Sequence, residues 1–357
     1  MAARAVLLAL LAAPLAAQNE VEPEDDSPER AYVVAPFVTS SPGFGSGAGL
    51  MSMFFYRPDA TDSVSPNSSL MGLGVYSDTD SYFGGIFNQL YLAEDHWRVN
   101  VGVLGGRVRS DLTVGALDNI KFDTNVGVAF ARAQRRLGSS DWFAGALASY
   151  TSFEYTSRNA AGDAYFKALD VRDESSAAVG AVGSFDTRDH PRWPTEGTLA
   201  EANLSLYPEW LGASTGYEVL QVTGNWYREP LASNVLALRA NGRFTPPDTP
   251  FAGLSSLGQR GELRGYTPGE NVAENLISTQ AEWRWMFAER VGAVGFGGVA
   301  GLYDGGVSNL DSDSIFWSGG VGLRYMLSVE NRLNFRLDFA WGEDDESGLY
   351  VSMGESF

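Results

Sequence analysis

The sequence predicts an all-β chain folded as a 16-stranded antiparallel transmembrane β-barrel. Segments of about ten residues with alternating polarity recur along the chain, separated by turns rich in Gly, Pro, Asn, Asp and Ser. Aromatic residues are frequent, with 9 Trp, 15 Tyr and 20 Phe in 357 residues. The chain also lacks the roughly 18 consecutive apolar residues that a membrane helix needs, so a membrane-spanning form must use strands.

Residues 1–17 have the features of a secretory signal peptide. One basic residue, Arg4, precedes an apolar run at residues 5–15, and small residues follow it. The next segment, QNEVEPEDDSPER at 18–30, is acidic, contains proline and lacks aromatics, which predicts a disordered periplasmic linker. The chain has no cysteine, so neither a disulfide nor a lipid-modified N-terminus can hold it after export. We expect residues 31–357 to form the barrel.

The alternation is clearest at residues 332–341, RLNFRLDFAW, where apolar residues at odd positions alternate with polar residues at even positions up to Asp338. Residues 278–287, STQAEWRWMF, have the same parity. One face of such a strand suits lipid and the other suits water. The sixteen predicted strands are residues 31–39, 44–56, 69–77, 81–92, 95–107, 123–136, 141–154, 174–187, 198–207, 216–230, 233–244, 276–288, 291–303, 313–327, 332–341 and 348–357.

A soluble β-sandwich would show the same alternation, because it would bury the apolar face and expose the charged one. Three features favour the membrane barrel. They are the signal peptide, the Trp and Tyr residues near strand ends, and the absence of a predicted helical segment that could cover a sheet.

An even-numbered closed barrel has both termini on the periplasmic side, with short periplasmic turns and longer outer loops. The sequence places the long connections 108–122, 155–173 and 245–275 outside. The predicted periplasmic connections 57–68 and 188–197 are longer than this rule expects. Residues 245–275 form the sixth outer loop in this topology.

Several motifs follow one another in the second half of the chain. They are FDTRDHPRWPTEG, the Arg264-Gly265-Tyr266 tripeptide in the sixth outer loop, GVGLRY, RLDFAW and the closing GLYVSMGESF. In this order the chain resembles the BamA/TamA-type outer-membrane barrels, the bacterial surface antigen family. The resemblance is close over about the last half of the chain and extends to the first half only as strand rhythm.

The resemblance implies a function in inserting other barrels into the bacterial outer membrane or in moving polypeptides across it. Members of this family usually carry periplasmic POTRA modules, and a linker of about a dozen residues cannot fold into one. The resemblance therefore indicates a member lacking POTRA domains, with a separate periplasmic partner protein or a client polypeptide. The alternative is a pore or transporter for small solutes, with a loop in the lumen as its plug.

The same resemblance implies that the sixth loop folds back into the lumen, with the Arg-Gly-aromatic tripeptide at its tip. An ordered loop loses about 1 to 2 kcal/mol of backbone entropy per residue, so it needs strong anchors. Arg264 can bond carboxylates on the wall, and Glu282 and Asp304 are the expected partners. Gly265 would let the backbone pass close to the wall, and Tyr266 would pack against it. A solvated turn is the alternative.

The motif FDTRDHPRWPTEG predicts a structured periplasmic turn. Asp186, Arg188 and Asp189 would form a local charge network, and Pro194 and Gly197 would set the bends. A direct role in gating or in partner docking is the alternative to this structural one.

Phe357 ends the last predicted strand. In outer-membrane barrels such a terminal aromatic strand serves as an assembly signal, whereas an interface anchor is the plainer interpretation. Both interpretations place Phe357 at the membrane boundary.

The composition argues against several other function classes. Only His96 and His190 could serve a catalytic site that needs histidine, and both fall in predicted periplasmic turns, so we expect no enzyme. No metal cluster, phosphate-binding loop or basic patch for nucleic acid is recognisable, and no cofactor is expected. The formal charge of -19 fits solvated outer loops and could also bias a pore toward cations. Outer-membrane lipids are the expected surroundings.

Overall fold

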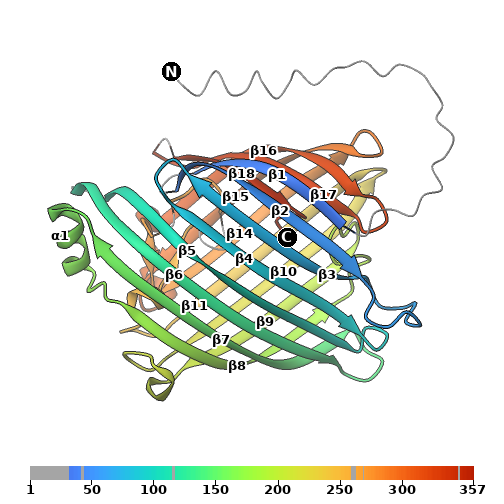
Figure 1. The fold of residues 1–357 in the computed structure, drawn as a ribbon, viewed down its shortest axis with the longest axis horizontal. Coiled ribbons are helices and arrows are strands. Elements are labelled where there is room, and N and C mark those ends of the chain that lie inside the picture. Colours follow the sequence, from blue (N-terminus) through green and yellow to red (C-terminus); the bar gives the residue numbers. More distant parts are fainter. Residues whose placement is uncertain (1–31, 42–43, 115–116, 259–262, 268, 345) are drawn as a thin grey trace. The chain divides into compact units, whose positions relative to one another are not determined.

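The computed structural model describes residues 32–41, 44–114, 117–258, 263–267, 269–344 and 346–357. The predicted signal peptide and linker, residues 1–17 and 18–30, lie outside the described residues. Within them, sixteen antiparallel strands form one closed barrel in sequence order, with β11 beside β14 and β18 beside β1 (Figure 1). The barrel strands are β1 (Tyr32–Ser41), β2 (Gly45–Tyr56), β3 (Ser68–Ser77), β4 (Tyr82–Leu92), β5 (Trp97–Val114), β6 (Leu117–Arg136), β7 (Trp142–Ser157), β8 (Glu174–Asp186), β9 (Gly197–Tyr207), β10 (Tyr217–Leu231), β11 (Asn234–Phe244), β14 (Asn275–Met286), β15 (Val291–Tyr303), β16 (Ile315–Ser328), β17 (Leu333–Trp341) and β18 (Ser347–Met353).

The predicted number and order of strands are therefore confirmed. The sixth outer loop contains two further short strands that are not part of the barrel, β12 (Ser255–Ser256) and β13 (Val272–Ala273), and these pair with each other. We call the end of the barrel that carries this loop the outer end. The opposite end carries the turn between β8 and β9.

The prediction of an outer loop at 108–122 is wrong. β5 continues to Val114 and β6 begins at Leu117, so this segment is mostly paired strand. Its polar side chains bond one another across the hairpin, and Arg109 Nε lies 3.3 Å from Asp123 Oδ1. A hairpin stabilised by cross-strand charges needs no apolar stripe, and its alternation therefore cannot be recognised by hydrophobic pattern alone.

The structure also contains a helix that the sequence pattern did not predict. A short helix, α1 (Ala160–Ala168), forms in the loop between β7 and β8, at the outer end (Figure 1). Asn159 caps it, because its side-chain oxygen accepts from Gly162 N at 2.9 Å. Asp163 in the first turn and Lys167 in the last complement the helix dipole. None of the helices among the described residues is long and apolar enough to cross a bilayer.

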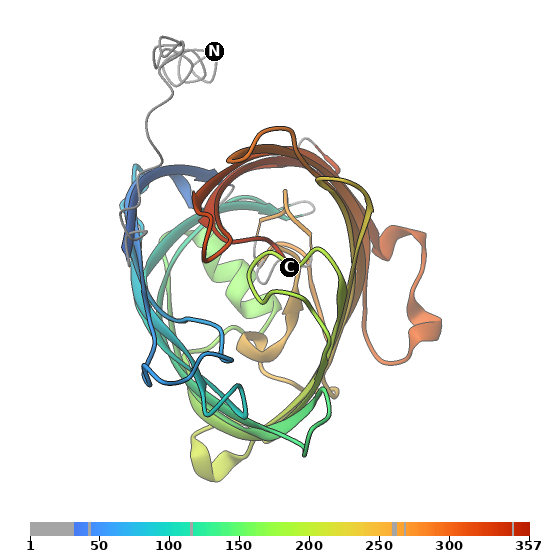
Figure 2. The same cartoon turned by 90° about the vertical axis from the view of Figure 1, so that its right-hand side faces the viewer.

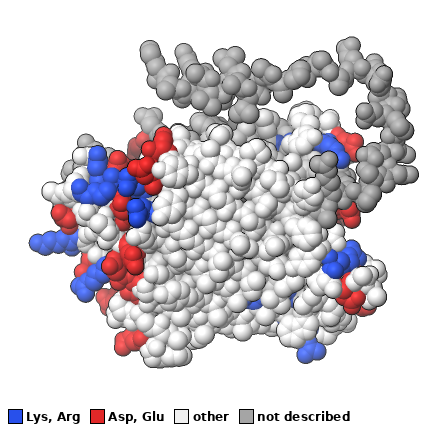
Figure 3. Space-filling view, viewed as in Figure 1, with Lys and Arg blue, Asp and Glu red and all other residues white. Residues whose placement is uncertain are grey.

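The two faces of the wall decide between barrel and sandwich. On β14, Trp283 and Trp285 point outward and are 41% and 50% exposed, whereas Glu282 and Arg284 point into the lumen and are 0% exposed. Figure 3 shows a middle band with few charged residues, and the Lys, Arg, Asp and Glu side chains on this face gather toward the two ends. Apolar side chains outside and buried charges inside are the arrangement of a membrane barrel, the reverse of a soluble sandwich.

The seam between the first and last strands is sparse. Among the described residues one pair joins them, Ser40 with Leu349, and Thr39 Oγ1 donates to Leu349 O at 3.2 Å. By contrast, β14 and β15 pair along the whole length of β14. The barrel is therefore closed weakly at this one place.

The last strand passes inside the first toward the inner end. Strand register puts Met353 on the outward face of β17 and β18, which it shares with Phe339 and Trp341. Met353 is nevertheless only 8% exposed and packs with Ala35 and Met51, which point inward from β1 and β2. Because the outward face of β18 contacts the inward face of β1, the two strands overlap. This overlap explains why only a single residue pair joins them at the seam among the described residues.

Candidate functional site

A network of buried charges lines the lumen beside the seam. It arises from the inward positions of three strands: Glu282 and Arg284 on β14, Arg324 on β16, and Arg336 and Asp338 on β17. Arg284 Nη2 lies 2.9 Å from Glu282 Oε2, and Arg324 Nη1 lies 2.6 Å from Asp338 Oδ1. Buried charges of this kind persist only when they are paired and hydrogen-bonded.

Arg264 of the sixth loop joins this network. Its Nη2 donates to Glu282 Oε1 at 2.6 Å and its Nη1 donates to Asp338 Oδ2 at 2.5 Å. The guanidinium also lies 3.5 Å from the centre of the Phe296 ring. The side chain of Arg264 is 5% exposed and those of both acceptors are 0% exposed. Arg264 therefore contacts the inner wall on three strands, β14, β15 and β17, and one predicted partner, Glu282, is present.

Asp338 is the partner that the sequence analysis missed, although its inward parity in RLDFAW was visible. The expectation for Asp304 is wrong, since its Oδ1 accepts from the backbone N–H of Glu274 at 2.9 Å instead. Glu274 Oε2 in turn accepts from Gly305 N at 2.7 Å. Asp304 directly follows β15 at the outer rim, so it holds the base of the sixth loop rather than its tip.

Gly265 and Tyr266 fix the backbone and the ring of the loop against the wall. Gly265 has φ +108, and an added Cβ would lie 3.2 Å from the backbone of Trp341 and Gly342. Its N–H donates to Tyr350 Oη at 2.8 Å. Tyr266 Oη donates to Trp317 O at 2.6 Å. A glycine is required here by both backbone conformation and space.

Apolar packing reinforces these polar contacts. Leu257, Leu263 and Tyr266 of the sixth loop form one buried cluster with residues of β14 and β15, which are Leu276, Ala300 and Leu302. Leu257 and Leu263 are 0% exposed. Burying a leucine side chain contributes about 1.5–3 kcal/mol, so this cluster offsets part of the entropy lost by ordering the loop.

The outer part of the loop contacts two other outer elements. Thr267 N donates to Glu346 Oε2 at 2.9 Å in the loop between β17 and β18, and Tyr165 Oη of α1 donates to Gly269 O at 2.7 Å. Partial burial and a hydrogen bond shared with Glu346 raise the pKa of Glu270 to about 8. Two carboxyl groups that share a proton in this way attract each other only while one of them is protonated.

The turn between β8 and β9 contains the predicted charge network in part. Arg188 Nε donates to Asp186 Oδ1 at 2.8 Å, and Arg98 of β5 binds the same carboxylate at 2.5 Å. Asp189 accepts instead from Thr195 N at 2.8 Å and from Arg332 Nη1 at 2.6 Å. The network therefore extends beyond the turn, and it ties the β8–β9 connection to β5 and to the turn before β17.

Pro194 and Gly197 shape this turn. Pro194 is buried, and Gly197 has φ +100, with Thr187 O 2.2 Å from the position of an added Cβ. No side chain fits there without a change in the backbone, which agrees with the predicted role of Gly197 in a bend. Burial and the nearby Arg332 lower the pKa of His190 to about 4.

The placement of Phe357 at the membrane boundary is wrong. β18 ends at Met353, and Gly354 has φ +86 and turns the chain away from the wall. The ring centre of Phe357 lies 5.5 Å from the guanidinium of Arg284, which points into the lumen, and Figure 2 shows this end of the chain inside the ring of strands. The lumen supplies cations and hydrogen-bond donors that the lipid boundary lacks.

The Omp85 superfamily domain matches residues 63–357. The chain belongs to the Omp85 superfamily. Its barrel is therefore an outer-membrane barrel, as the sequence predicted, and the predicted relationship to BamA-type barrels is confirmed. Comparison with curated proteins gave no match.

Solved structures with the same fold include two kinds of Omp85-like neighbour. BamA from Haemophilus ducreyi lacking POTRA domains 1–3 has 14% identity and a TM-score of 0.55, with 91% of this chain and 70% of that chain covered. CdiB from Escherichia coli has 11% identity and a TM-score of 0.61, with 92% and 62% covered. CdiB from Acinetobacter baumannii has 11% identity and a TM-score of 0.57, with 90% and 59% covered. This Omp85 barrel thus spans less than two thirds of either CdiB chain.

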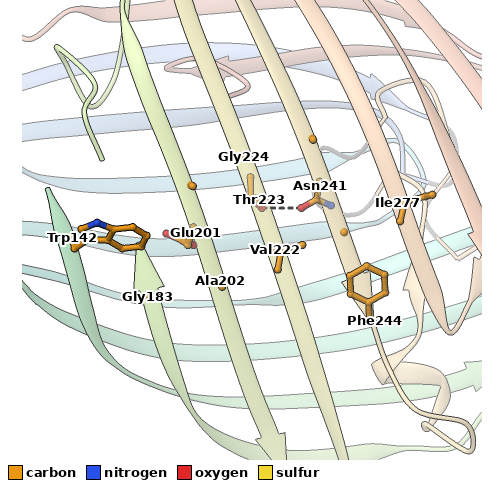
Figure 4. A pocket seen from close by; sticks show the side chains of 13 residues that line it. Trp142, Gly183, Glu201, Ala202, Val222, Thr223, Gly224, Asn241, Phe244 and Ile277 are labelled. Atoms are coloured by element: carbon orange, nitrogen blue, oxygen red, sulfur yellow. Dashed lines mark hydrogen bonds between the residues drawn. The ribbon is translucent and has the colours of Figure 1, made fainter. Parts of the chain in front are cut away.

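A depression in the wall of the Omp85 barrel is a weaker candidate for a site. It measures about 550 Å³ and lies over β7 to β11 and β14, where small residues such as Gly224 and Ala202 leave room (Figure 4). Its polar pair, Thr223 Oγ1 donating to Asn241 Oδ1 at 2.9 Å, has inward parity. The lipid-facing part is apolar, so this depression offers no convergent polar groups for chemistry.

Proposed function

We propose that this Omp85 barrel inserts polypeptides into the outer membrane or passes them across it, and that the client uses the seam between β1 and β18. The observation that carries this proposal is the overlap at the seam. One residue pair joins the two strands at the outer end, and side-chain packing replaces backbone pairing toward the inner end. Separating them breaks few hydrogen bonds, whereas separating β14 from β15 would break a complete ladder.

The side chains at the seam can pack against different neighbours. Met51, Met53 and Met353 belong to the buried cluster beneath it, and Met71 packs against that cluster. Methionine side chains adapt to irregular surfaces, so this cluster can repack when β18 moves. An exposed edge of β1 would also offer unpaired N–H and C=O groups to an incoming strand.

A disulfide across the seam tests this proposal, since the chain has no cysteine of its own. Ser40 and Leu349 are direct partners, and Cα atoms of such pairs lie about 4.5–5.5 Å apart, within disulfide range. The variant Ser40→Cys/Leu349→Cys should lose insertion of an unfolded barrel client into proteoliposomes when oxidised and regain it with reductant. Thr279→Cys/Val299→Cys, across β14 and β15, is the matched control and should insert clients in both states. Equal activity of the oxidised seam variant would refute the use of the seam.

The alternative, a pore for small solutes, predicts steady conductance through a lumen that the sixth loop plugs. Arg264 joins β14 and β17 across the inner wall, which favours a lumen kept closed by the loop. Conductance of the purified barrel in a planar bilayer that persists in the oxidised seam variant would support the pore instead.

Two further parts of the proposal concern partners and chemistry. A periplasmic partner protein should co-purify with the intact barrel if client delivery needs one, and outer-membrane lipids should contact the uncharged band.

We infer a non-catalytic function. His96 Nδ1 lies 2.7 Å from Ala93 O, and His190 Nδ1 accepts from Arg192 N at 3.2 Å, so each ring contacts the backbone of its own turn. The described residues contain no group of side chains suited to a metal ion.

A further inference from the structure

The segment from Gly354 to Phe357 occupies the lumen as a bound peptide would. Gly354 N donates to Asn334 O at 2.7 Å, and beyond it the segment has no strand partner among the described residues. Its remaining contacts are with inward side chains of the wall. A segment held by side chains can be exchanged for another segment of similar chemistry without dismantling the sheet.

Two features of the segment are recognised separately. The carboxylate of Glu355 accepts from Arg324 Nε at 2.9 and 3.0 Å and from Asn334 Nδ2 at 3.1 Å. The main-chain oxygen of Phe357 accepts from Arg284 Nη2 at 2.6 Å. The ring centre of Phe357 lies near two guanidinium groups, 5.6 Å from that of Arg239 and 5.5 Å from that of Arg284. The site therefore binds one carboxylate and one aromatic ring, the second through cation–π contacts.

The arginine cluster, which includes Arg264 of the sixth loop, has more cationic groups than the carboxylates of the wall can match. Arg264, Arg284, Arg324 and Arg336 share Glu282 and Asp338, and Glu355 is the third carboxylate of the cluster. Arg284 Nη1 and Arg324 Nη2 have no hydrogen-bond partner, although the two residues are 0% and 1% exposed. Buried donors without acceptors are costly, so an empty site would favour another anionic ligand.

The site lies near the inner mouth of the barrel. Arg284 is 5.5 Å from the ring centre of Trp193, which belongs to the turn between β8 and β9. A polypeptide that arrives from the periplasm would reach this place before it reaches the sixth loop, which contacts the same network through Arg264.

We propose that this arginine cluster is a binding site for an acidic peptide segment that carries an aromatic residue, and that Glu355 and Phe357 occupy it in cis. The inference rests on the proposed function, because the peptide would be part of a client polypeptide. Removing the resident side chains should open the site to the same chemistry supplied in trans.

The test uses the full barrel in nanodiscs and a fluorescein-labelled peptide, Ser-Met-Gly-Glu-Ser-Phe, which copies residues 352–357. The variant Glu355→Gln/Phe357→Ala vacates the site and leaves every arginine in place. Fluorescence anisotropy should show that it binds the peptide at least about tenfold more tightly than the native chain does. Phe357→Ala alone, which keeps the Glu355 ion pairs, should give an intermediate affinity and serves if the double variant folds poorly.

Matched controls separate recognition from general attraction to a cationic lumen. The peptide Ser-Met-Gly-Gln-Ser-Ala should bind the vacated variant at least about tenfold more weakly, and inorganic phosphate should compete only weakly because it lacks the ring. Arg324→Lys in the vacated background should weaken binding, whereas Arg132→Lys, in the ion pair with Glu201 on β6 and β9, should not.

Equal binding of both peptides, or binding by the folded vacated variant no tighter than by the native chain, would overturn the inference. The measurement needs no client insertion. Absence of peptide binding would therefore not contradict the proposed insertion function, and failure of client insertion would not contradict the peptide site.

Discussion

Replacing Arg264 with alanine should release the sixth loop from the lumen wall. Arg264 makes charge-assisted hydrogen bonds of 2.6 and 2.5 Å to Glu282 and Asp338, whose side chains are both 0% exposed. Breaking a buried ion pair costs about 3–5 kcal/mol. Glu282 keeps Arg284, and Asp338 keeps Arg324 and Arg336, so we expect the low end, about 3 kcal/mol.

A change of about 3 kcal/mol shifts the ratio of detached to attached loops by roughly a hundredfold. The assay is cleavage of the loop by a protease added outside sealed proteoliposomes, under conditions where reclosing is faster than cleavage. The cleavage rate then follows the population of detached loops, so it should rise by a similar factor. Arg264→Lys should give a smaller rise, because lysine keeps the charge and loses the planar fork.

Arg172→Ala is the matched control, since Arg172 pairs with Asp170 in another outer loop and both side chains are about three quarters exposed. Exposed pairs contribute little, so the cleavage rate should not change. Glu282→Ala should release the loop as Arg264→Ala does, and the double variant should be no worse than the worse single variant. An unchanged rate in Arg264→Ala, or simple addition of the two effects, would refute the anchoring argument.

Three other predictions concern the outer loops and the inner turn. Burial and the bond to Glu346 raise the pKa of Glu270 from 4.5 to about 8, so the folded loop binds a proton that the detached loop releases. Loop protection from protease should therefore fall as pH rises from 4.5 to 8, and Glu270→Gln should remove this dependence. The pKa of His190 is lowered from 6.5 to about 4, so the pH dependence has the opposite direction. The turn between β8 and β9 should lose hydrogen-exchange protection as pH falls from 6.5 to about 4, whereas the variant His190→Gln should keep it. Gly265→Ala, at φ +108 and against the backbone of Trp341 and Gly342, should detach the loop at a cost of about 1–3 kcal/mol. Gly269→Ala, at φ +87 but with open space for an added Cβ, has the backbone strain without the close contact and should detach it less. Equal protease sensitivity of these two variants would contradict the close approach at Gly265.

The sequence predicted what depends on local periodicity. Alternation at period two placed Glu282 inside and Trp283 outside, and turn residues separated the strands, so strand number and order followed directly. The same parity, applied to RLDFAW, places Asp338 inside as well. Its pairing with Arg264 was missed because distance across a closed barrel depends on register, which no local pattern gives.

Other features depend on contacts that lie far apart in sequence. The hairpin beyond residue 107 is held by charges rather than by an apolar stripe, so its alternation resembled a polar loop. α1 is nine residues long and is stabilised by its Asn159 cap and by packing on β6, which a search for long apolar periodicity does not detect. The path of Phe357 was set by one left-handed glycine, Gly354, and by arginines on β11 and β14.

The lengths of the strands also matter to the membrane around the barrel. β18 has seven residues and β17 has nine, whereas β5 and β6 have 18 and 20. At about 3.4 Å per residue β18 extends for roughly 24 Å before any tilt, and a bilayer has a hydrocarbon core about 30 Å thick. The wall is therefore shorter than the bilayer core at β18, beside the seam, and tall enough at β5 and β6. A wall shorter than the bilayer core is accommodated by local thinning of the bilayer, so on the proposed route a new strand would enter where we expect the membrane to be thinnest.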